Sequence, residues 1–174
     1  MRDEAEFIEF AAAVRGRLRR TAYLLCGDWE QASDHVQEGL IRVYVAWPRL
    51  TRAGREYAYA RKAVVSACID HARRRSNTEV VGDPGVDVAS GHDVADSVSA
   101  RADVMSALAE LPARQRACVV LRYFDDLSVA DTAAALGCSE GTVKSQTSRG
   151  LASLRSVLTG SPVGEPATEG ALSW

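Results

Sequence analysis

Hydrophobic residues between positions 127 and 154 recur at the spacing of α-helices, in two runs that a glycine separates. Ser128 precedes the first run and has Asp131 three residues later, which is the pattern of a helix N-cap. Gly137 is expected to end this helix, and Ser139 to cap the next one. We therefore predict two short helices joined by a tight turn. Their apolar faces are Val129, Ala133, Ala134 and Leu136 in the first helix, and Val143, Leu151 and Leu154 in the second.

The polar positions of the second helix are expected on its solvent side. Two short helices joined by a glycine-containing turn are typical of a DNA-binding helix-turn-helix, whose second helix enters the major groove. Lys144 and Arg149 would then supply affinity through phosphates, and the Gln146 amide could read adenine. A plain helical hairpin in an all-α core is the alternative interpretation. These polar positions are Thr142, Lys144, Ser145, Gln146 and Arg149.

The rest of the chain is also patterned for helices, and no segment is typical of a strand bounded by hairpin turns. Asp28 and Gln31 have the spacing of a capping box. Further along, a helix is expected to end near Leu111, and Pro112 suits the first turn of another. The sequence thus predicts an all-α fold. The other apolar helical patterns are Phe7, Phe10, Ala11, Val14 and Leu18; Val36, Leu40, Ile41, Val43 and Tyr44; residues 57–72; and Val119, Val120, Leu121, Tyr123 and Phe124.

Residues 78–99 interrupt these patterns. They are rich in Gly, Asp, Ser and Val and contain Pro84, which is typical of a linker. We predict two small helical domains, residues 1–76 and 101–159, joined by a flexible linker over residues 77–100, with the helix-turn-helix in the second domain. The tail, residues 160–174, contains two prolines and three glycines and is expected to be disordered.

The charge of the chain is unevenly distributed. A formal net charge of −2 over 174 residues does not itself indicate a nucleic-acid-binding protein. Residues 60–76 nevertheless carry a net charge of +4, and residues 77–100 carry −5 without a basic residue. A basic helix end is therefore followed by an acidic linker. The charged residues are Arg61, Lys62, Asp70, Arg73, Arg74 and Arg75 in the first segment, and Glu79, Asp83, Asp87, Asp93 and Asp96 in the second.

Composition excludes several classes of protein. Apolar residues make up 47% and charged residues 25% of the chain, as in ordinary globular proteins. The chain starts with charged residues and has no apolar run near 18 residues, so we expect neither a signal peptide nor membrane insertion, and a cytoplasmic location. The cysteines lack CxxC spacing and lie among apolar neighbours, so they are interpreted as buried free thiols. They are Cys26, Cys68, Cys118 and Cys138.

An enzyme is not expected. The chain contains His35, His71 and His92 and many carboxylates, but it has no phosphate-cradling glycine loop, HExxH sequence or nucleophile elbow. Isolated histidines and carboxylates on helices are usually surface or capping groups. We therefore expect no catalytic residue, no cofactor and no metal site.

Three segments together resemble a known family. GDWEQASDHVQEGLIRVYVAW, YARKAVVSACIDHARRR and LAELPARQRACVVLRYFDDLSVADTAAALGCSEGTVKSQTSRGLASLR occur in this order along the chain. They resemble the polymerase-binding helix, the promoter-opening helix and the upstream-promoter reader of bacterial RNA polymerase sigma factors of the extracytoplasmic-function group, particularly the small actinobacterial type. The resemblance covers nearly all of residues 1–159 and implies a protein that directs transcription initiation.

The resemblance also assigns roles to particular residues. It implies core RNA polymerase, promoter DNA and an anti-sigma factor as partners. The surface for the polymerase clamp is Asp34, Gln37, Glu38, Ile41 and Arg42. The surface for the unstacked minus-10 strand is Tyr57, Tyr59, Arg61, Lys62, Ser66, Arg73, Arg74 and Arg75. The reader of the minus-35 element is Ser139, Glu140, Thr142, Lys144, Ser145, Gln146 and Arg149.

Other interpretations of these residues are open at the level of sequence. The polymerase surface is also consistent with a solvated helix face, and Tyr57 and Tyr59 with partly buried core positions. The three consecutive arginines also suit a helix C-terminus electrostatically. Among whole-protein alternatives, a one-component helix-turn-helix regulator would carry a ligand-binding or receiver module in place of residues 28–76. A protein adaptor without sigma activity would not bind duplex promoter DNA.

The sequence departs from the usual family pattern at three positions. Ser66 stands where many relatives have Asn, and Gln146 stands where Arg or a bulky residue is frequent. The promoter sequence is therefore not transferable from the family. Gly150 replaces a more usual Ala, which costs about 0.5–1 kcal/mol of helix stability unless close packing requires a glycine.

Overall fold

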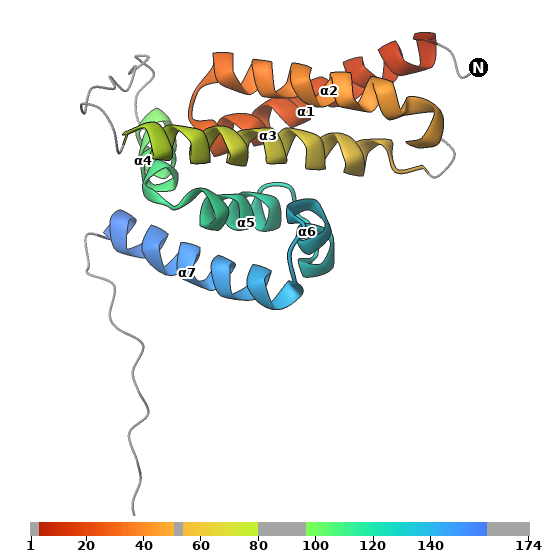
Figure 1. Ribbon diagram of the computed structural model, residues 1–174. Coiled ribbons are helices and arrows are strands. Elements are labelled where there is room, and N and C mark those ends of the chain that lie inside the picture. The colour runs from red at the N-terminus through yellow and green to blue at the C-terminus, as the bar shows by residue number, and fades with distance from the viewer. Residues whose placement is uncertain (1–3, 51–53, 80–96, 160–174) are drawn as a thin grey trace, which may run out of the picture.

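A computed structural model describes residues 4–50, 54–79 and 97–159 of the chain. Within this described part the chain is helical and contains no strand. Figure 1 shows α1, α2 and α3 packed together, with α5 between α3 and α7. The helices are α1 (Glu4–Cys26), α2 (Trp29–Leu50), α3 (Glu56–Glu79), α4 (Ser97–Glu110), α5 (Ala113–Tyr123), α6 (Val129–Leu136) and α7 (Glu140–Thr159).

The first domain is a bundle of α1, α2 and α3 around a core that includes Leu18, Val36 and Val64. A glycine sets the distance between α2 and α3. A Cβ atom added at Gly39 would lie 2.5 Å from Cγ2 of Val64, which is fully buried. Because real atoms do not approach so closely, this crossing of the two helices requires a residue without a side chain.

The turn between α1 and α2 is built by the two residues that separate the helices. Gly27 has φ 78°, a left-handed conformation that glycine adopts without strain. The carboxylate of Asp28 then accepts a hydrogen bond from the Gln31 amide at 2.8 Å and so caps α2. This confirms the backbone half of the predicted capping box.

The second domain contains the predicted helix-turn-helix. Ser128 accepts a hydrogen bond from the Asp131 amide at 3.0 Å, and Ser139 accepts one from the Thr142 amide at 3.1 Å. Gly137 ends α6 with φ 63°. Both N-caps and the C-terminal glycine are therefore confirmed, since each residue satisfies or allows the backbone geometry of a helix end.

Gly150 allows α7 to pack closely against α5. A Cβ atom at this position would lie 2.8 Å from Cγ2 of Val119 and 3.4 Å from the carbonyl oxygen of Gln115. Val119 is itself buried. The unusual glycine is thus explained by packing, which outweighs its weak helix propensity.

Several details of the sequence analysis are wrong. Ala134 is exposed, and Ala135 takes the buried place on α6, because the helix turns Thr132, Ala133 and Ala135 toward the core. Pro112 is the N-cap of α5 and lies just outside its first turn. Leu111 follows the end of α4, as predicted.

The predicted linker is shorter than expected at both ends. Residues 77–79 belong to α3 and residues 97–100 to α4, so the helices extend into the predicted linker. The remainder of that linker and the tail from residue 160 lie outside the described residues.

The interpretation of the cysteines is correct only in part. All four are free thiols, but only Cys68 and Cys118 are buried. Cys26 and Cys138 are half-buried: Cys26 is the last residue of α1, and Cys138 lies in the turn between α6 and α7. Burial raises the pKa of the Cys68 thiol far above its usual value, and that of Cys118 to about 11.

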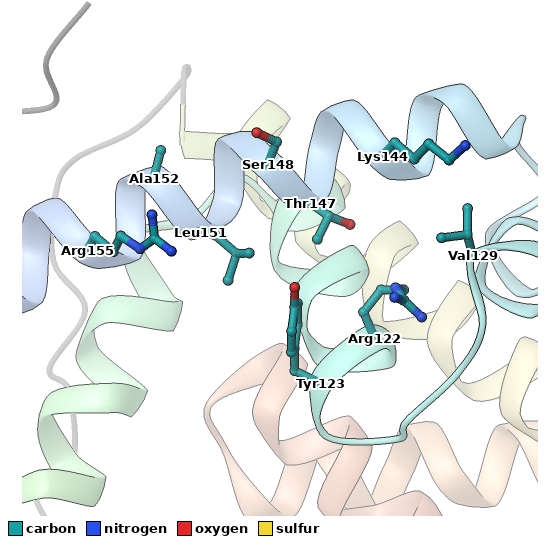
Figure 2. Close-up of a pocket in the computed structure, with 9 residues that line it drawn as sticks. All are labelled: Arg122, Tyr123, Val129, Lys144, Thr147, Ser148, Leu151, Ala152 and Arg155. Carbon is teal, nitrogen blue, oxygen red and sulfur yellow. The ribbon is translucent and has the colours of Figure 1, made fainter. Parts of the chain in front are cut away.

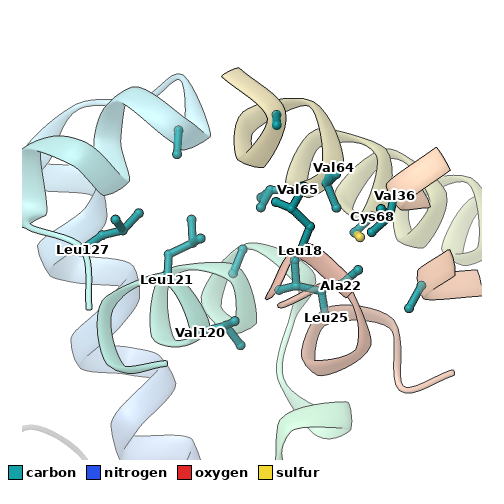
Figure 3. Close-up of a cluster of buried hydrophobic side chains, with 14 of the residues drawn as sticks. Leu18, Ala22, Leu25, Val36, Val64, Val65, Cys68, Val120, Leu121 and Leu127 are labelled. Carbon is teal, nitrogen blue, oxygen red and sulfur yellow. The ribbon is translucent and has the colours of Figure 1, made fainter. Parts of the chain in front are cut away.

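The two domains pack against each other. Helix α3 contacts α5 and α6, and α1 contacts α4 and α5. Apolar side chains of both domains form one continuous cluster, in which Leu18 and Val65 come from the first domain and Leu121 and Leu127 from the second (Figure 3). The helix-turn-helix is therefore held against α1 and α3 in this structure.

Candidate polymerase and nucleic-acid surfaces

The face of α2 predicted to bind a protein is exposed to solvent. Its predicted residues recur at intervals of three or four, which places them on one side of the helix, and every one of them is exposed. Glu38 and Arg42 form an ion pair along this face. These residues are Asp34, Gln37, Glu38, Ile41 and Arg42.

Two apolar side chains outside the predicted set, Tyr44 and Val45, extend the same face. Val45 is 76% exposed and Tyr44 51%, beside the predicted Ile41 at 58%. Phe7 of α1 holds the Tyr44 ring in an edge contact, with 4.9 Å between the ring centroids. An apolar strip bordered by polar and charged side chains is the usual arrangement of a helix-binding protein surface. The sequence signal for this extension is the spacing of Val45, four residues beyond Ile41 on the same helix.

The residues of α3 predicted to bind the minus-10 strand have unequal exposure. Tyr59 and Lys62 are exposed, three residues apart on the helix. Tyr57 and Ser66 are half-buried. The Arg61 side chain is only 8% exposed, so it is not available to a phosphate in this structure.

Tyr57 lies beside two guanidinium groups. The Cζ atoms of Arg17 and Arg61 are 5.3 Å and 5.2 Å from the centroid of its ring. These are cation–π contacts, and they give Arg61 a partner inside the protein. Burial raises the pKa of the Tyr57 phenol. This tyrosine is thus partly a core residue, as the alternative interpretation allowed, whereas Tyr59 is not.

The three arginines near the end of α3 are exposed. Arg73 forms an ion pair with Asp70 at 3.4 Å, and both side chains are largely open to solvent. Exposed pairs of this kind contribute little to stability.

Most of the predicted DNA-reading residues lie exposed along the first half of α7. Ser139, Glu140, Lys144, Ser145 and Arg149 are exposed. Thr142 and Gln146 are half-buried, contrary to the prediction that both face solvent, because they border α3 and α6. The hydroxyl groups of Ser139 and Thr142 also bond each other at 2.9 Å.

A groove with basic ends lies between α5 and α7. Figure 2 shows Arg122 and Tyr123 of α5 directed toward α7, with Lys144 and Arg155 at opposite ends of the groove. The groove has a volume of about 440 Å³, and no acidic residue lines it. Arg122 and Arg155 were not among the predicted DNA-binding residues. Arg122 joins Lys144 and Arg155 in one groove only through the packing of α5 on α7.

A smaller cleft brings the two predicted DNA surfaces together. Ser66, Ile69 and Asp70 of α3 line it from one side. Thr142 and Gln146 of α7 line it from the other. Its volume is about 150 Å³. Residues assigned to two different promoter elements therefore face each other across one narrow space.

Two protein-family models match this chain. Residues 10–78 match the family model of sigma-70 region 2, and residues 101–154 match that of sigma-70 region 4. The chain is 38% identical over 156 residues to the RNA polymerase sigma-E factor of Streptomyces avermitilis, covering 88% of this chain and 87% of that protein. It is 33% identical over 142 residues to the ECF RNA polymerase sigma factor SigM of Mycobacterium tuberculosis, covering 82% and 71%.

This chain is a sigma factor of the extracytoplasmic-function group. A solved structure, the sigma factor RpoE of Bartonella quintana in complex with the anti-sigma factor NepR, matches its fold with a TM-score of 0.70. That match covers 88% of this sigma factor and 97% of the other chain at 24% identity. The predicted fold class and family are thereby confirmed.

The structure also bears on membrane-spanning helices, metal sites and histidine clusters in this sigma factor. No helix in residues 4–50, 54–79 or 97–159 is long and apolar enough to cross a membrane. The same residues contain no group of His, Cys, Asp and Glu side chains suited to holding a metal ion. His35 and His71 do approach each other between α2 and α3, with ring centroids 5.3 Å apart.

Proposed function

We propose that this sigma factor binds core RNA polymerase through α2, holds the unstacked minus-10 strand with α3, and reads the minus-35 duplex with α7. The observation that carries the proposal is that different helices expose surfaces of different chemistry. Helix α2 exposes an apolar strip suited to a protein partner. The N-terminal half of α7 is basic and polar and begins at a capped turn, and such a helix is suited to the major groove.

The chemistry of each surface fits its proposed role. Ile41 and Val45 supply apolar area that is buried on binding, and the surrounding carboxylates and arginine orient a partner helix. Tyr59 has an exposed ring on which a splayed base can stack, and Lys62 adds a cation for its phosphate. On α7, Lys144 and Arg149 are placed for phosphates, and Gln146 for a base edge.

The cellular location that we propose for the sigma factor, and its lack of enzymatic activity, follow from the same roles. The sigma factor acts in the cytoplasm, where core polymerase and promoter DNA meet. It carries out no reaction of its own, since bond formation during initiation belongs to the polymerase. We also propose an anti-sigma factor as a partner, because the sigma factor RpoE that shares this fold was crystallised with one. A captured protein that inhibits run-off transcription by this sigma factor would identify it.

The experiment that tests the proposed function is run-off transcription with purified core polymerase on a pooled promoter library, followed by sequencing of the transcripts. Starts that depend on the sigma factor and share two spaced sequence elements are expected. If no such starts appear although residues 101–158 bind duplex DNA, the regulator alternative is favoured. If neither starts nor duplex binding is observed, the adaptor alternative replaces our proposal.

A further inference from the structure

The groove between α5 and α7 carries a positive charge that the described part of the chain does not neutralise. Lys144 and Arg155 lie at its two ends, and Arg122 projects into it from α5 (Figure 2). Within residues 4–50, 54–79 and 97–159, neither Lys144 nor Arg155 forms an ion pair with a carboxylate. Arg122 donates a hydrogen bond to the carbonyl oxygen of Leu127, which is uncharged. The groove therefore attracts an acidic ligand.

The middle of the groove is apolar. Val129, Leu151 and Ala152 line it together with Tyr123, whose side chain is 58% exposed. A large aromatic side chain contributes binding energy when a partner covers it. Apolar surface bordered by cations suits an acidic peptide with some apolar side chains better than it suits a simple anion.

A segment of this chemistry follows α7 directly in the sequence. The tail, residues 160–174, reads GSPVGEPATEGALSW and lies outside the described residues. Its charged residues are Glu165 and Glu169, so its net charge of −2 is complementary to the three cations of the groove. Its large apolar residues are Val163, Leu172 and Trp174.

The first residues of the tail favour a change of chain direction. Gly160 comes directly after Thr159, the last residue of α7, and Pro162 follows two residues later. A glycine just after a helix, followed closely by a proline, is the sequence pattern that ends a helix and redirects the chain. The pattern is consistent with a tail that returns along α7.

The two glutamates have a spacing close to that of the cations at the ends of the groove. Lys144 and Arg155 are 11 residues apart on α7, about 17 Å along the helix axis. Glu165 and Glu169 are 4 residues apart, about 13 Å in an extended chain. An extended chain from Thr159 to Glu169 spans about 33 Å, which exceeds the roughly 22 Å of helix between Thr159 and Lys144. Glu165 can therefore reach Arg155, and Glu169 can reach Lys144.

We infer that the groove between α5 and α7 is a docking site for the chain's own tail, with Glu165 beside Arg155 and Glu169 beside Lys144. The docking does not depend on any assigned function. Its consequence for DNA rests on the proposed function, in which Lys144 contacts a phosphate. The docked tail then competes with duplex phosphates for this cation and weakens binding to DNA of any sequence.

The test of docking compares amide NMR spectra of the full chain with those of a chain that stops after Thr159. Differences are expected at groove residues such as Thr147, Ser148 and Leu151, and they should persist on dilution and disappear at high salt. Absence of these differences would overturn the docking. Differences that vanish on dilution would assign the groove to the tail of a second copy, and differences confined to α2 would place the tail on the apolar strip. Either outcome would also overturn the inference.

Matched variants of the full chain test the charge pairing. The double variant Glu165→Gln and Glu169→Gln should give groove signals like those of the truncated chain. Its control, Glu9→Gln with Asp103→Asn, removes two exposed carboxylates elsewhere and should keep the wild-type signals. If the control also loses them, the effect is one of net charge, and the pairing is wrong.

A second pair of variants tests the groove side of the contact. Arg155→Gln should reduce the difference between the full and truncated chains. Arg149→Gln removes a cation of the same helix that does not line the groove, and the difference should remain. Equal effects of the two substitutions would show that the tail responds to the charge of α7 as a whole, which would overturn the assigned site.

Fluorescence anisotropy with a short random-sequence duplex at low salt tests the consequence for DNA. The truncated chain and the Glu165→Gln, Glu169→Gln variant should bind about threefold tighter than the full chain, as expected for a weak tethered competitor at millimolar effective concentration. The Glu9→Gln, Asp103→Asn control should bind like the wild type. Docking in the NMR spectra without tighter DNA binding would overturn the competition.

Failure of the proposed function is distinguishable from failure of this inference. Run-off transcription with the wild-type chain decides whether it is active with core polymerase, and the NMR comparison decides whether the tail occupies the groove. A chain whose tail docks but which supports no transcription keeps the docking site and loses the sigma activity.

Discussion

At the scale of single residues, two glycines within helices differ in whether the surrounding structure leaves room for a side chain. A Cβ atom at Gly150 would meet Val119, whereas one at Gly16 in α1 would have no atom within 4 Å. Helix propensity favours alanine over glycine by about 1 kcal/mol at either position. The balance between propensity and overpacking therefore differs, and it differs only because of what surrounds each backbone.

Gly150→Ala is expected to lower the free energy of unfolding by about 1–2 kcal/mol, since overpacking against a stiff, buried valine exceeds the gain in propensity. Gly16→Ala, the matched control, should raise it by about 0.5–1 kcal/mol. Urea denaturation followed by circular dichroism measures both. A Gly150→Ala variant as stable as Gly16→Ala would show that α5 and α7 are not in close contact.

His35 makes stability depend on pH. Its ring is buried next to His71, and burial, followed by the nearby His71, lowers the pKa of His35 below its usual 6.5. The unfolded chain then binds a proton more readily than the folded chain, so this contribution is complete above pH 6.5 and is lost as the pH falls through the lowered pKa. Denaturation midpoints measured from pH 7.5 to 5 should decrease. The His35→Leu variant should show a smaller decrease; an equal one would assign the effect to other groups.

At the scale of elements, α2 is buried on one side and apolar on part of the other. Val36 and Val43 face the core, and Ile41 and Val45 face solvent. A helix that exposes large apolar residues in a row normally has a partner for them. The element therefore carries two interfaces, one made by folding and one available for binding.

Val45→Asp should weaken binding to core polymerase at least about tenfold, because a charge would be placed in the apolar centre of the interface. Leu158→Asp, at a residue 51% exposed on α7, is the matched control. Biolayer interferometry with immobilised core polymerase measures both variants. If Leu158→Asp weakens binding as strongly as Val45→Asp, the assignment of this surface to α2 fails.

The α7 helix separates affinity from sequence reading. Lys144→Ala should weaken promoter binding by the polymerase complex for all sequences and reduce the slope of log affinity against log salt by about one. Gln146→Ala carries no charge change, so it should keep the slope and relax preference at one base pair by about 1–3 kcal/mol. Binding to a promoter library at several salt concentrations distinguishes them. Uniform weakening by Gln146→Ala would exclude base reading.

At the scale of the whole molecule, local signals were predictable and long-range contacts were not. The caps at Ser128 and Ser139 and the turn at Gly137 depend on neighbours within a few residues, so the sequence indicates them. The partner of Asp125 is Thr21, which is 104 residues away, and no periodicity connects them. Predicted exposure failed for the same reason at Arg61 and Gln146, since helical spacing shows which face of a helix is polar and not what that face meets.

The cleft between the domains also has a chemical consequence. Cys118 and Cys138 line it, and Cys118 is 1% exposed with its pKa raised to about 11 by burial. A thiol reagent attacks the thiolate, so it modifies Cys118 only when solvent reaches that side chain. The rate of alkylation at Cys118 therefore reports how often the two domains separate, without a probe attached to the protein.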